Sequence, residues 1–301
     1  MRARYVLPPL SVAALLLTGC VDNSLPEMTG ADARVATVTV NAEAAALLPA
    51  DVAGSGVLAI GTAPNYAPNE FKNSDGQAVG WDLELARGVA AALGLDSVVY
   101  DASFDNIVPS VRGGKFDIGA SSFTDTVERE KQLDFVHYYD AGVQWAAPAE
   151  STVDPEDACG LKVAVQATTF QDTTEIPEKS AACVAAGKPA IEKMLFDSQG
   201  NAINAVVLGQ ADAFSADSPV ALYAISKLNG KLKPVGETFD VAPYGFAVAK
   251  GSGMAEAVQL ALQGMIEDGS YGAILDAWGV GAGGLEQIRI NAAGADAAAT
   301  S

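Results

Sequence analysis

Residues 104–129 read FDNIVPSVRGGKFDIGASSFTDTVER, and this stretch decides the fold. Its first part predicts a helix over Phe104–Val111 that Gly113 ends, and its second part predicts a short strand over Phe116–Ala120. The strand runs into polar residues, and a second helix is expected to begin near Thr126. This order of helix, strand and polar strand end is typical of α/β folds, in which ligands bind beyond the carboxyl ends of the strands.

The same alternation extends in both directions from this stretch. Upstream, the pattern predicts a strand over Gly56–Ile60 and a helix that begins at Asp82, with Leu85, Val89 and Leu93 on one face and Gly94 as its stop. The chain is long enough for two lobes rather than one core. The remaining segments that continue the alternation are Val98–Tyr100, Lys162–Gln166, Ala202–Leu208 and Ala211–Ala216.

The N-terminus carries the features of an export signal. Arg2 and Arg4 precede an apolar run over Val6–Leu17, which is too short to cross about 30 Å of hydrocarbon as a helix. The following Thr18-Gly19-Cys20 resembles the bacterial lipobox, in which the cysteine is lipidated; the alternative is an ordinary signal peptide with a buried cysteine. We therefore expect residues 1–20 to be a lipoprotein signal peptide and Cys20 to anchor the protein at the extracellular face of the cell membrane.

The segments at the two ends of the folded part are expected to be unstructured. Residues 21–50 are rich in Ala, Thr, Val and Asn, as suits a tether from the membrane, and residues 291–301 indicate a disordered tail. Two lobes built from residues 51–290 would then stand clear of the membrane surface.

Charge and cysteine content narrow the possible partners of the protein and the cellular compartment in which it works. The formal net charge is −19, and removal of the leader makes it two units more negative, which excludes nucleic acid as a partner. Cys159 and Cys183 form the one pair left for a disulfide, which is the default outside the cytoplasm; the alternative is two buried thiols. Such a bond would stabilise the fold by about 3 kcal/mol on the chain-entropy model.

Short motifs follow one another along the chain in a fixed order. They are Ile60-Gly61, Tyr66-Ala67-Pro68-Asn69-Glu70-Phe71, Val79-Gly80-Trp81-Asp82-Leu83, Ile107-Val108-Pro109, Gly114-Lys115-Phe116-Asp117, residues 121–129, Leu133-Asp134-Phe135, Tyr138-Tyr139, residues 165–169 and residues 211–220. Each motif is weak alone. In this order they resemble the polar amino acid-binding members of the extracellular solute-binding protein family 3, and the resemblance covers residues 56 to about 280.

The resemblance implies a type II periplasmic-binding-protein fold, with two α/β sandwich lobes joined by a two-strand hinge. Lobe 1 would comprise residues 51–147 plus 246–290, and lobe 2 residues 148–245. The implied function is to bind a free amino acid by hinge closure and to deliver it to the permease subunits of an ABC importer. The resemblance implies a monomer that uses no cofactor and no metal.

An amino acid ligand presents a carboxylate and an ammonium group, and both must be neutralised when they leave water. Arg129 is expected one turn into its helix, where its guanidinium can bind the carboxylate; the alternative is an exposed arginine paired with Glu128 or Glu130. Thr124 and Ser122 would add hydrogen bonds to the ligand backbone, although such residues at helix starts are usually caps.

The facing lobe is expected to supply the complementary groups. Asp217 ends the predicted strand Ala211–Ala216 and can meet the ammonium; its alternative role is to cap the helix that contains Pro219. Thr169 offers a hydroxyl and a backbone amide to the ligand carboxylate; its alternative role is to cap a helix. Tyr66 is expected against the ligand side chain, whereas Phe71 is more simply a core residue.

Four positions depart from the family pattern: Asn69 replaces an aromatic residue, Asp125 an apolar residue, Val127 a proline and Thr168 a glycine. Side-chain specificity therefore depends on where two carboxylates point. If Asp125 or Glu70 lines the pocket, a cationic ligand is favoured and glutamate is disfavoured. If both face solvent, Asn69 suggests a neutral polar ligand.

Two other classes of function share this fold. The first is an enzyme, either a cyclohexadienyl-dehydratase-like protein or a lytic transglycosylase with a binding lobe, with Glu70 or Asp125 as the acid. His137 is the one histidine and lies near the hinge, so no catalytic triad or Cys/His metal cluster is indicated, and we assign no catalytic residue. The second is a sensor that reports the ligand to a membrane receptor.

Overall fold

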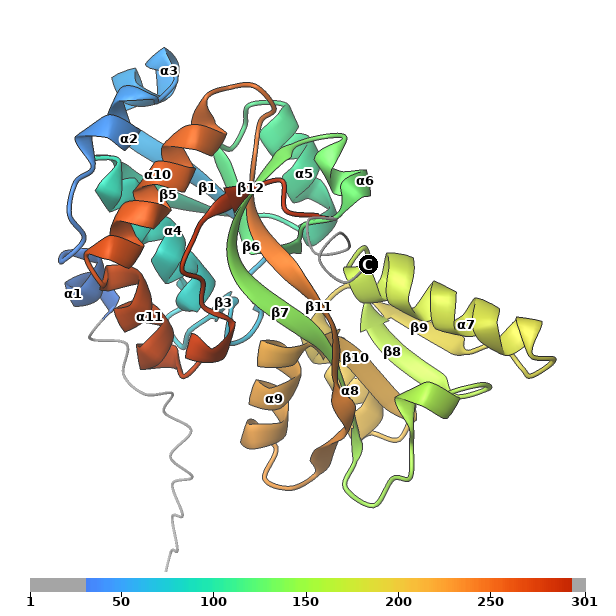
Figure 1. Ribbon diagram of the computed structural model, residues 1–301. Helices are drawn as coiled ribbons and strands as arrows, with labels where there is room; N and C mark the ends of the chain where they lie inside the picture. The colour runs from blue at the N-terminus through green and yellow to red at the C-terminus, as the bar shows by residue number, and fades with distance from the viewer. Residues whose placement is uncertain (1–30, 294–301) are drawn as a thin grey trace, which may run out of the picture.

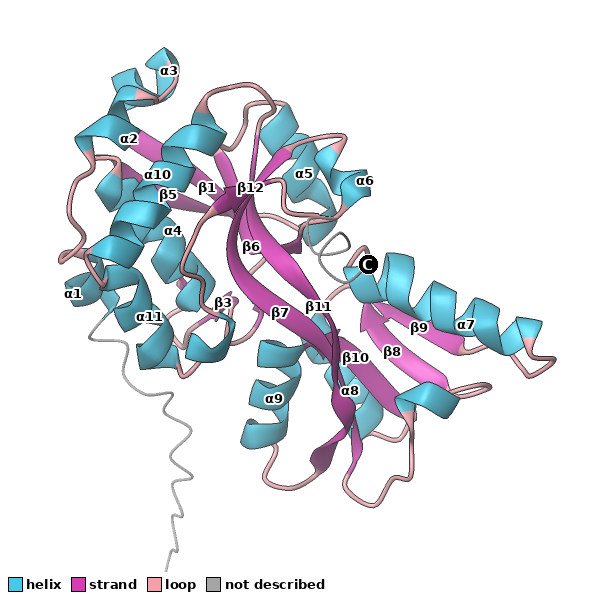
Figure 2. Cartoon of the chain, viewed as in Figure 1, coloured by secondary structure: helices cyan, strands magenta, loops and turns pink. Residues whose placement is uncertain are grey.

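The computed structural model describes residues 31–293 and has two α/β lobes joined by a pair of long strands (Figures 1 and 2). Residues 1–20, with the expected leader and Cys20, lie outside the described residues. One mixed sheet runs through both lobes in the order β5-β1-β6-β11-β7-β10-β8-β9, with β12 on β7. A small antiparallel sheet, β2-β3-β4, lies in lobe 1. The predicted α/β class and two-lobed architecture are confirmed.

Five strands of the main sheet overlap the predicted ones, namely β1, β5, β6, β8 and β10, whereas β9 was not predicted. β1 pairs in parallel with β5 and β6 in lobe 1, and β8 pairs in parallel with β9 and β10 in lobe 2. Parallel pairing places the carboxyl ends of these strands at one edge of each lobe, where a ligand can bind. The bounds are β1 Val57–Thr62, β2 Asn65–Tyr66, β3 Glu70–Lys72, β4 Ala78–Val79, β5 Asp96–Asp101, β6 Ile118–Thr124, β8 Lys162–Gln166, β9 Glu192–Phe196 and β10 Ala213–Asp217.

The connection between the lobes consists of β7 (Asp134–Pro148) and β11 (Leu232–Val248), which run antiparallel through the centre of Figure 1. Their Ala141↔Ala242 pair marks the crossing, because Val143 already pairs with Asp217 of lobe 2. Lobe 1 is therefore residues 31–141 plus 242–293, and lobe 2 is residues 142–241. The expected boundaries at 147/148 and 245/246 lie a few residues beyond this crossing, since β7 changes partners before it ends.

Helices cover both faces of the sheet in each lobe (Figure 2). In lobe 1, the Asp82 helix begins one residue earlier than expected, and fully buried Leu85 and Val89 pack in the larger core. In lobe 2, the predicted segment Ala202–Leu208 belongs to a helix that begins at Gln199. The bounds are α4 Trp81–Ala92, α5 Phe104–Arg112, α6 Val127–Glu130, α7 Ile176–Ala185, α8 Gln199–Val207, α9 Ser218–Lys227, α10 Met254–Glu267 and α11 Ser270–Trp278.

The tether expected over residues 21–50 is wrong for its described part. Residues 31–55 form three short helices, α1 (Ala31–Val35), α2 (Ala42–Ala46) and α3 (Ala50–Ser55), and lie against lobe 1. Ala44 is fully buried, and Arg34 donates to Glu84 of α4 at 2.9 Å. Buried Ala44 and Val52, with Val38 and Leu48 packed against the same core cluster, make this segment part of the fold.

The disordered tail expected over residues 291–301 is wrong for its described part, residues 291–293. The Asn291 side chain donates to Asp134 at 2.9 Å, and the backbone N–H of Ala292 donates to Asp125 Oδ2 at 2.7 Å. These bonds follow β12 (Arg289–Ile290), which pairs with β7. Residues 294–301 lie outside the described residues.

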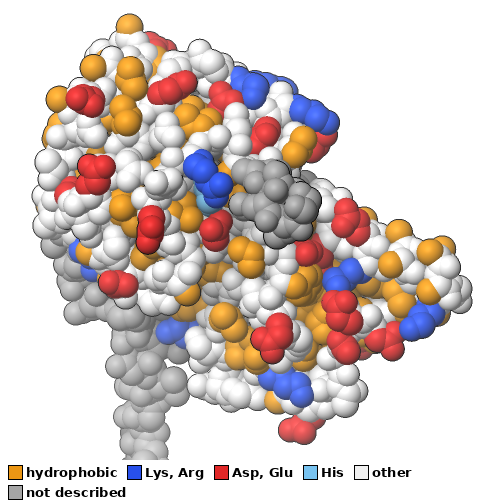
Figure 3. Space-filling model, in the orientation of Figure 1, with side chains coloured by type: hydrophobic (Ala, Val, Ile, Leu, Met, Phe, Trp, Pro, Cys, Tyr) orange, Lys and Arg blue, Asp and Glu red, His pale blue; other side chains and the backbone are white. Residues whose placement is uncertain are grey.

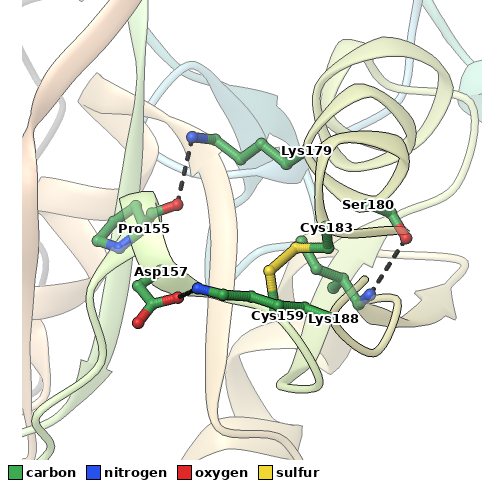
Figure 4. The surroundings of a disulfide bond; sticks show 8 residues. Pro155, Asp157, Cys159, Lys179, Ser180, Cys183 and Lys188 are labelled. Carbon is green, nitrogen blue, oxygen red and sulfur yellow. Dashed lines mark hydrogen bonds and ion pairs between the residues drawn. A yellow bond between two sulfur atoms is a disulfide. The ribbon is translucent and has the colours of Figure 1, made fainter. Parts of the chain in front are cut away.

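The predicted disulfide is confirmed. Cys159 and Cys183 are bonded, with their Cα atoms 5.5 Å apart, and they join the turn after η1 (Pro155–Asp157) to α7 (Figure 4). Lys188 pairs with Asp157 at 2.7 Å beside the bond. These contacts fix α7 to lobe 2 on the side away from the crossing strands.

The surface is charged without a single dominant patch on the face that Figure 3 shows, where acidic and basic side chains are spread over both lobes. On this face no basic patch is present that would bind a polyanion. Among residues 31–293, no helix combines the length and the apolar character needed to cross a bilayer.

Candidate ligand-binding site between the lobes

A cavity lies between the lobes at the carboxyl ends of β6, β8 and β10. All six residues that the sequence predicts for ligand binding line this cavity. Lobe 1 contributes Ala63, Asn65, Tyr66, Glu70, Phe104, Ser121, Ser122, Thr124 and Arg129, and lobe 2 contributes Gln166, Thr169, Phe170 and Asp217. The fold therefore brings together groups that are more than 150 residues apart in sequence.

Arg129 supplies the positive charge of the cavity. It lies in the first turn of α6, whose N-cap residue Thr126 accepts the Arg129 N–H at 3.2 Å. The guanidinium donates to the Thr124 carbonyl at 2.7 Å and, across the cleft, to the Thr168 carbonyl at 3.1 Å. An arginine has five N–H donors, so three remain for a ligand. Burial lowers the pKa of Arg129 to about 10, which keeps it charged at neutral pH.

The alternative pairing of Arg129 with its acidic neighbours is not the one observed. Glu128 pairs instead with Lys131, and Glu130 accepts the backbone N–H of Ala293. The Arg129 guanidinium lies over the rings of Phe104 and Phe123, with 5.8 and 5.7 Å from Cζ to the ring centroids. These rings hold the plane of the guanidinium in a fixed orientation towards the cavity.

Asp217 supplies a negative charge from lobe 2. It occupies the N-cap position of α9, yet its side chain makes no cap hydrogen bond. Its carboxylate accepts instead from Gln171 at 2.7 Å and from the Tyr66 hydroxyl of lobe 1 at 2.9 Å. Burial raises the pKa of Asp217, while hydrogen bonds and the Arg129 charge act against this rise. The carboxylate is thus oriented towards the cavity by both lobes.

The hydroxyl groups of the site have mixed roles. Thr169 donates to the Gln166 carbonyl at 2.7 Å and accepts the Asp172 N–H at 3.4 Å, so its capping alternative is realised even though it lines the cavity. Thr168 adopts φ +64°, which favours glycine and accounts for glycine being usual at this position. Thr168 is also the residue whose carbonyl accepts the hydrogen bond from Arg129 across the cleft.

Of the two carboxylates whose positions decide the charge preference, Glu70 lines the cavity and Asp125 does not. Glu70 accepts hydrogen bonds from Ser121 at 3.2 Å and Ser122 at 3.0 Å. Asp125 accepts the N–H groups of the C-terminal segment. Phe71 packs edge-on against Trp278 and is absent from the cavity lining, as its core interpretation requires.

Sequence reasoning missed several lining residues. Phe104 stacks on Phe123 with ring centroids 4.7 Å apart, and an aromatic residue at a helix start gives no signal that separates core from cavity. Gln166 ends β8 and so carried the same strand-end signal as Asp217, which could have identified it. The others missed are Ala63, Asn65, Ser121 and Phe170, together with Gln171 behind Asp217.

Residues 58–281 match the model of the bacterial extracellular solute-binding proteins, family 3. An arginine-binding protein, ArgT, of Corynebacterium glutamicum is 41% identical over 251 residues, which cover 83% of both chains. A probable histidine-binding protein of Campylobacter jejuni is 30% identical over 62% of this chain and 71% of its own.

Solved structures with the same fold include amino acid-binding proteins with and without a link to catalysis. An ancestral arginine-binding protein bound to arginine superposes with a TM-score of 0.68 at 34% identity, covering 74% of this chain and 98% of its own. The ancestral amino acid-binding protein AncCDT-1, a precursor of cyclohexadienyl dehydratase, superposes with a TM-score of 0.66 at 33% identity. The match covers 76% of this chain and 97% of that protein.

Proposed function

The chain belongs to the bacterial extracellular solute-binding proteins, family 3, and on this basis we propose that it captures a cationic amino acid, with arginine as the first candidate, for an ABC importer. Proteins of this family bind solutes outside the cytoplasm and are mainly non-enzymatic. The observation that carries the choice of ligand is the buried Glu70 carboxyl in a cavity that also holds one arginine and one aspartate.

The cavity has one charged group for each charge of such a ligand. Arg129 binds the ligand carboxylate, with help from Thr124 and Thr169, and Asp217 binds its ammonium group. Glu70 lines the lobe 1 wall of the same cavity and accepts from Ser121 and Ser122, whereas Arg129 donates to the Thr124 carbonyl. A guanidinium or ammonium side chain can therefore meet Glu70, whereas a glutamate side chain would meet a group of its own charge.

Hinge closure follows from contacts that already bridge the cleft. Tyr66 of lobe 1 donates to Asp217 of lobe 2, and Arg129 donates to the Thr168 carbonyl of lobe 2. A ligand that touches Arg129 and Asp217 together gains its full set of contacts when the lobes are closed, so binding favours the closed state. The importer would recognise that closed state and not the ligand itself.

The enzymatic alternative has less support from the acidic groups. Asp125, one of its two candidate acids, is bound to the N–H groups of Ala292 and Ala293 and is not a cavity residue. Glu70 is the other candidate and is needed for charge selection in this account. Conversion of prephenate or arogenate by the purified protein would contradict the proposed non-enzymatic role.

We also propose that the mature protein begins at Cys20, carries lipid there and acts as a monomer at the outer face of the membrane. The support is the sequence Thr18-Gly19-Cys20 after an apolar run. The intact mass of the protein extracted from membranes tests it, because an unmodified cysteine would remove the anchor.

A calorimetric screen of the protein from Val21 onward against the standard amino acids tests the proposed ligand class. We expect L-arginine to bind at least ~10-fold more tightly than L-glutamine, which corresponds to about 1.4 kcal/mol, because only the former pairs with Glu70. L-glutamate should bind more weakly than both. Preferential binding of glutamate or of an apolar amino acid would refute the assignment, and so would no binding by any of them in ligand-free protein.

A further inference from the structure

Beside Glu70 lies a second buried carboxyl group, Asp82, which does not line the ligand cavity. Glu70 begins β3 and is 1% exposed, and Asp82 lies in the first turn of α4 and is fully buried. The preceding Gly80 adopts φ +137°, and a Cβ there would lie 2.0 Å from the Asn69 carbonyl oxygen. This close approach fixes the start of α4 against the chain segment that carries Glu70.

The two carboxyl groups are joined through Ser122. The Ser122 N–H donates to Asp82 Oδ2 at 3.1 Å, and its hydroxyl donates to Glu70 Oε2 at 3.0 Å. Asn69 donates to the same hydroxyl at 2.9 Å and accepts from the Trp81 indole at 2.8 Å. Ser122 has φ +52°, a strained conformation that these contacts maintain.

Among residues 31–293, Arg129 is the one arginine or lysine that lines the cavity with Glu70. The titratable side chains that face the pair of Glu70 and Asp82 are the hydroxyls of Tyr138 from β7 and Tyr66 from β2, both neutral at pH 7. The two other charged residues of the cavity already have partners. Arg129 donates to the carbonyls of Thr124 and Thr168, and Asp217 accepts from the Tyr66 hydroxyl. Burial, followed by the charge of Asp82, raises the pKa of Glu70 well above its usual value, and burial raises that of Asp82 to about 6.

We propose that Glu70 and Asp82 share one proton in the ligand-free protein, and that a cationic ligand side chain displaces this proton into solvent when it binds. The inference rests on the proposed function, because it requires a cationic ligand in the cavity. One O–H bond of the carboxyl pair breaks, the proton goes to water or buffer, and the positive charge of the ligand replaces it. Asp82 is then a positioning residue that acts on specificity through Glu70.

The direction of the pH dependence follows from this exchange. Below the pKa of Glu70 in the ligand-free protein, binding of a cation requires loss of a proton, so affinity falls by up to tenfold for each unit that the pH decreases. Above that pKa the proton is already lost, and affinity no longer depends on it. A neutral ligand leaves the proton in place, so its affinity should not change over the same range.

Calorimetric titration at pH 6.5 in buffers of different ionisation enthalpy counts the protons released on binding. With L-arginine in phosphate and in imidazole, we expect close to one proton per ligand, and with L-glutamine close to none. Arginine binding without proton release between pH 5.5 and 8 would overturn the inference and leave the proposed function intact. Absence of arginine binding would instead overturn the proposed function.

A matched pair of variants assigns the proton to this site. Asp82→Asn keeps an oxygen acceptor for the Ser122 N–H but removes the charge, so the proton release at pH 6.5 should fall by half or more. Glu175→Gln alters another buried carboxyl, in lobe 2, which accepts from Trp145 at 2.8 Å and Ser215 at 2.7 Å and whose pKa burial raises to about 7.

The control variant should retain the release of one proton. Unchanged release in Asp82→Asn, or its loss in Glu175→Gln, would refute the role of Asp82. If Asp82→Asn does not fold, the wild-type comparison still decides the matter, because equal proton release with arginine and glutamine would contradict the displacement.

Discussion

Replacement of Arg129 by alanine is expected to weaken amino acid binding by about 3 kcal/mol or more, which is a loss of at least ~100-fold in affinity. The reason is that the ligand carboxylate would leave water without a counter-charge, since no other cation lines the cavity among the described residues. Neutral and cationic amino acids should lose affinity alike, because the carboxylate is common to both. Titration calorimetry of the purified variant measures the effect.

Two controls separate binding from folding in this experiment. Arg112→Ala removes an exposed arginine that donates to Gln132 at 3.2 Å, outside the cavity, and should leave the affinity unchanged within about threefold. Thermal unfolding of ligand-free Arg129→Ala should resemble that of the wild type apart from the loss of two hydrogen bonds to carbonyls. Arginine affinity retained in the folded variant would refute the assigned role of Arg129.

Replacement of Glu70 by glutamine is expected to invert the preference between charged and neutral ligands. The change keeps the size of the side chain and one of the two oxygen acceptors for Ser121 and Ser122 but removes the carboxylate. L-Arginine should lose about 2 kcal/mol, or ~30-fold in affinity, because a charged hydrogen bond becomes a neutral one. L-Glutamine should bind as well as before, and the ratio of the two affinities is the quantity to measure.

The matched control for this change is Asp125→Asn. Asp125 is also a buried carboxylate, and burial followed by the nearby Glu130 raises its pKa to about 7, yet it binds the C-terminal segment rather than the cavity. Its replacement should leave the arginine-to-glutamine ratio within about threefold of the wild type. If Asp125→Asn changes the ratio and Glu70→Gln does not, charge selection lies at the other carboxylate and the ligand orientation must be redrawn.

The sequence predicted the site residues best where a polar residue follows a buried strand. Thr124 ends β6 and Asp217 ends β10, and in each lobe the carboxyl ends of the parallel strands lie at one edge, which borders the cavity. Arg129 could be placed because Thr126 is a recognisable N-cap. These inferences depend only on local patterns and on strand direction.

The orientation of Glu70 could not be predicted in this way. It lies on a strand of three residues, β3, where alternation has too few positions to show which face is buried. Its environment depends on Ser122 and Asp82, which lie on two other elements. The side-chain specificity of the cavity therefore became visible only in three dimensions.

The position of the hinge and the N-terminal helices were missed for different reasons. β7 is almost continuously buried from Phe135 to Ala147. Its pattern therefore does not show where the neighbour on its second edge changes from β12 to β10, while β11 pairs with it throughout. The helices of residues 31–55 have only five or six residues each, and helices this short form only against an existing core. Tertiary packing decided both features.

The most direct test of the whole account is a crystal structure of the protein with L-arginine. The account predicts that the ligand carboxylate contacts the Arg129 guanidinium, that its ammonium group contacts Asp217 and that its side-chain guanidinium contacts Glu70. Arginine bound outside the interlobe cavity would contradict the site, and arginine bound in the cavity with its side chain directed away from Glu70 would contradict the proposed basis of charge selection.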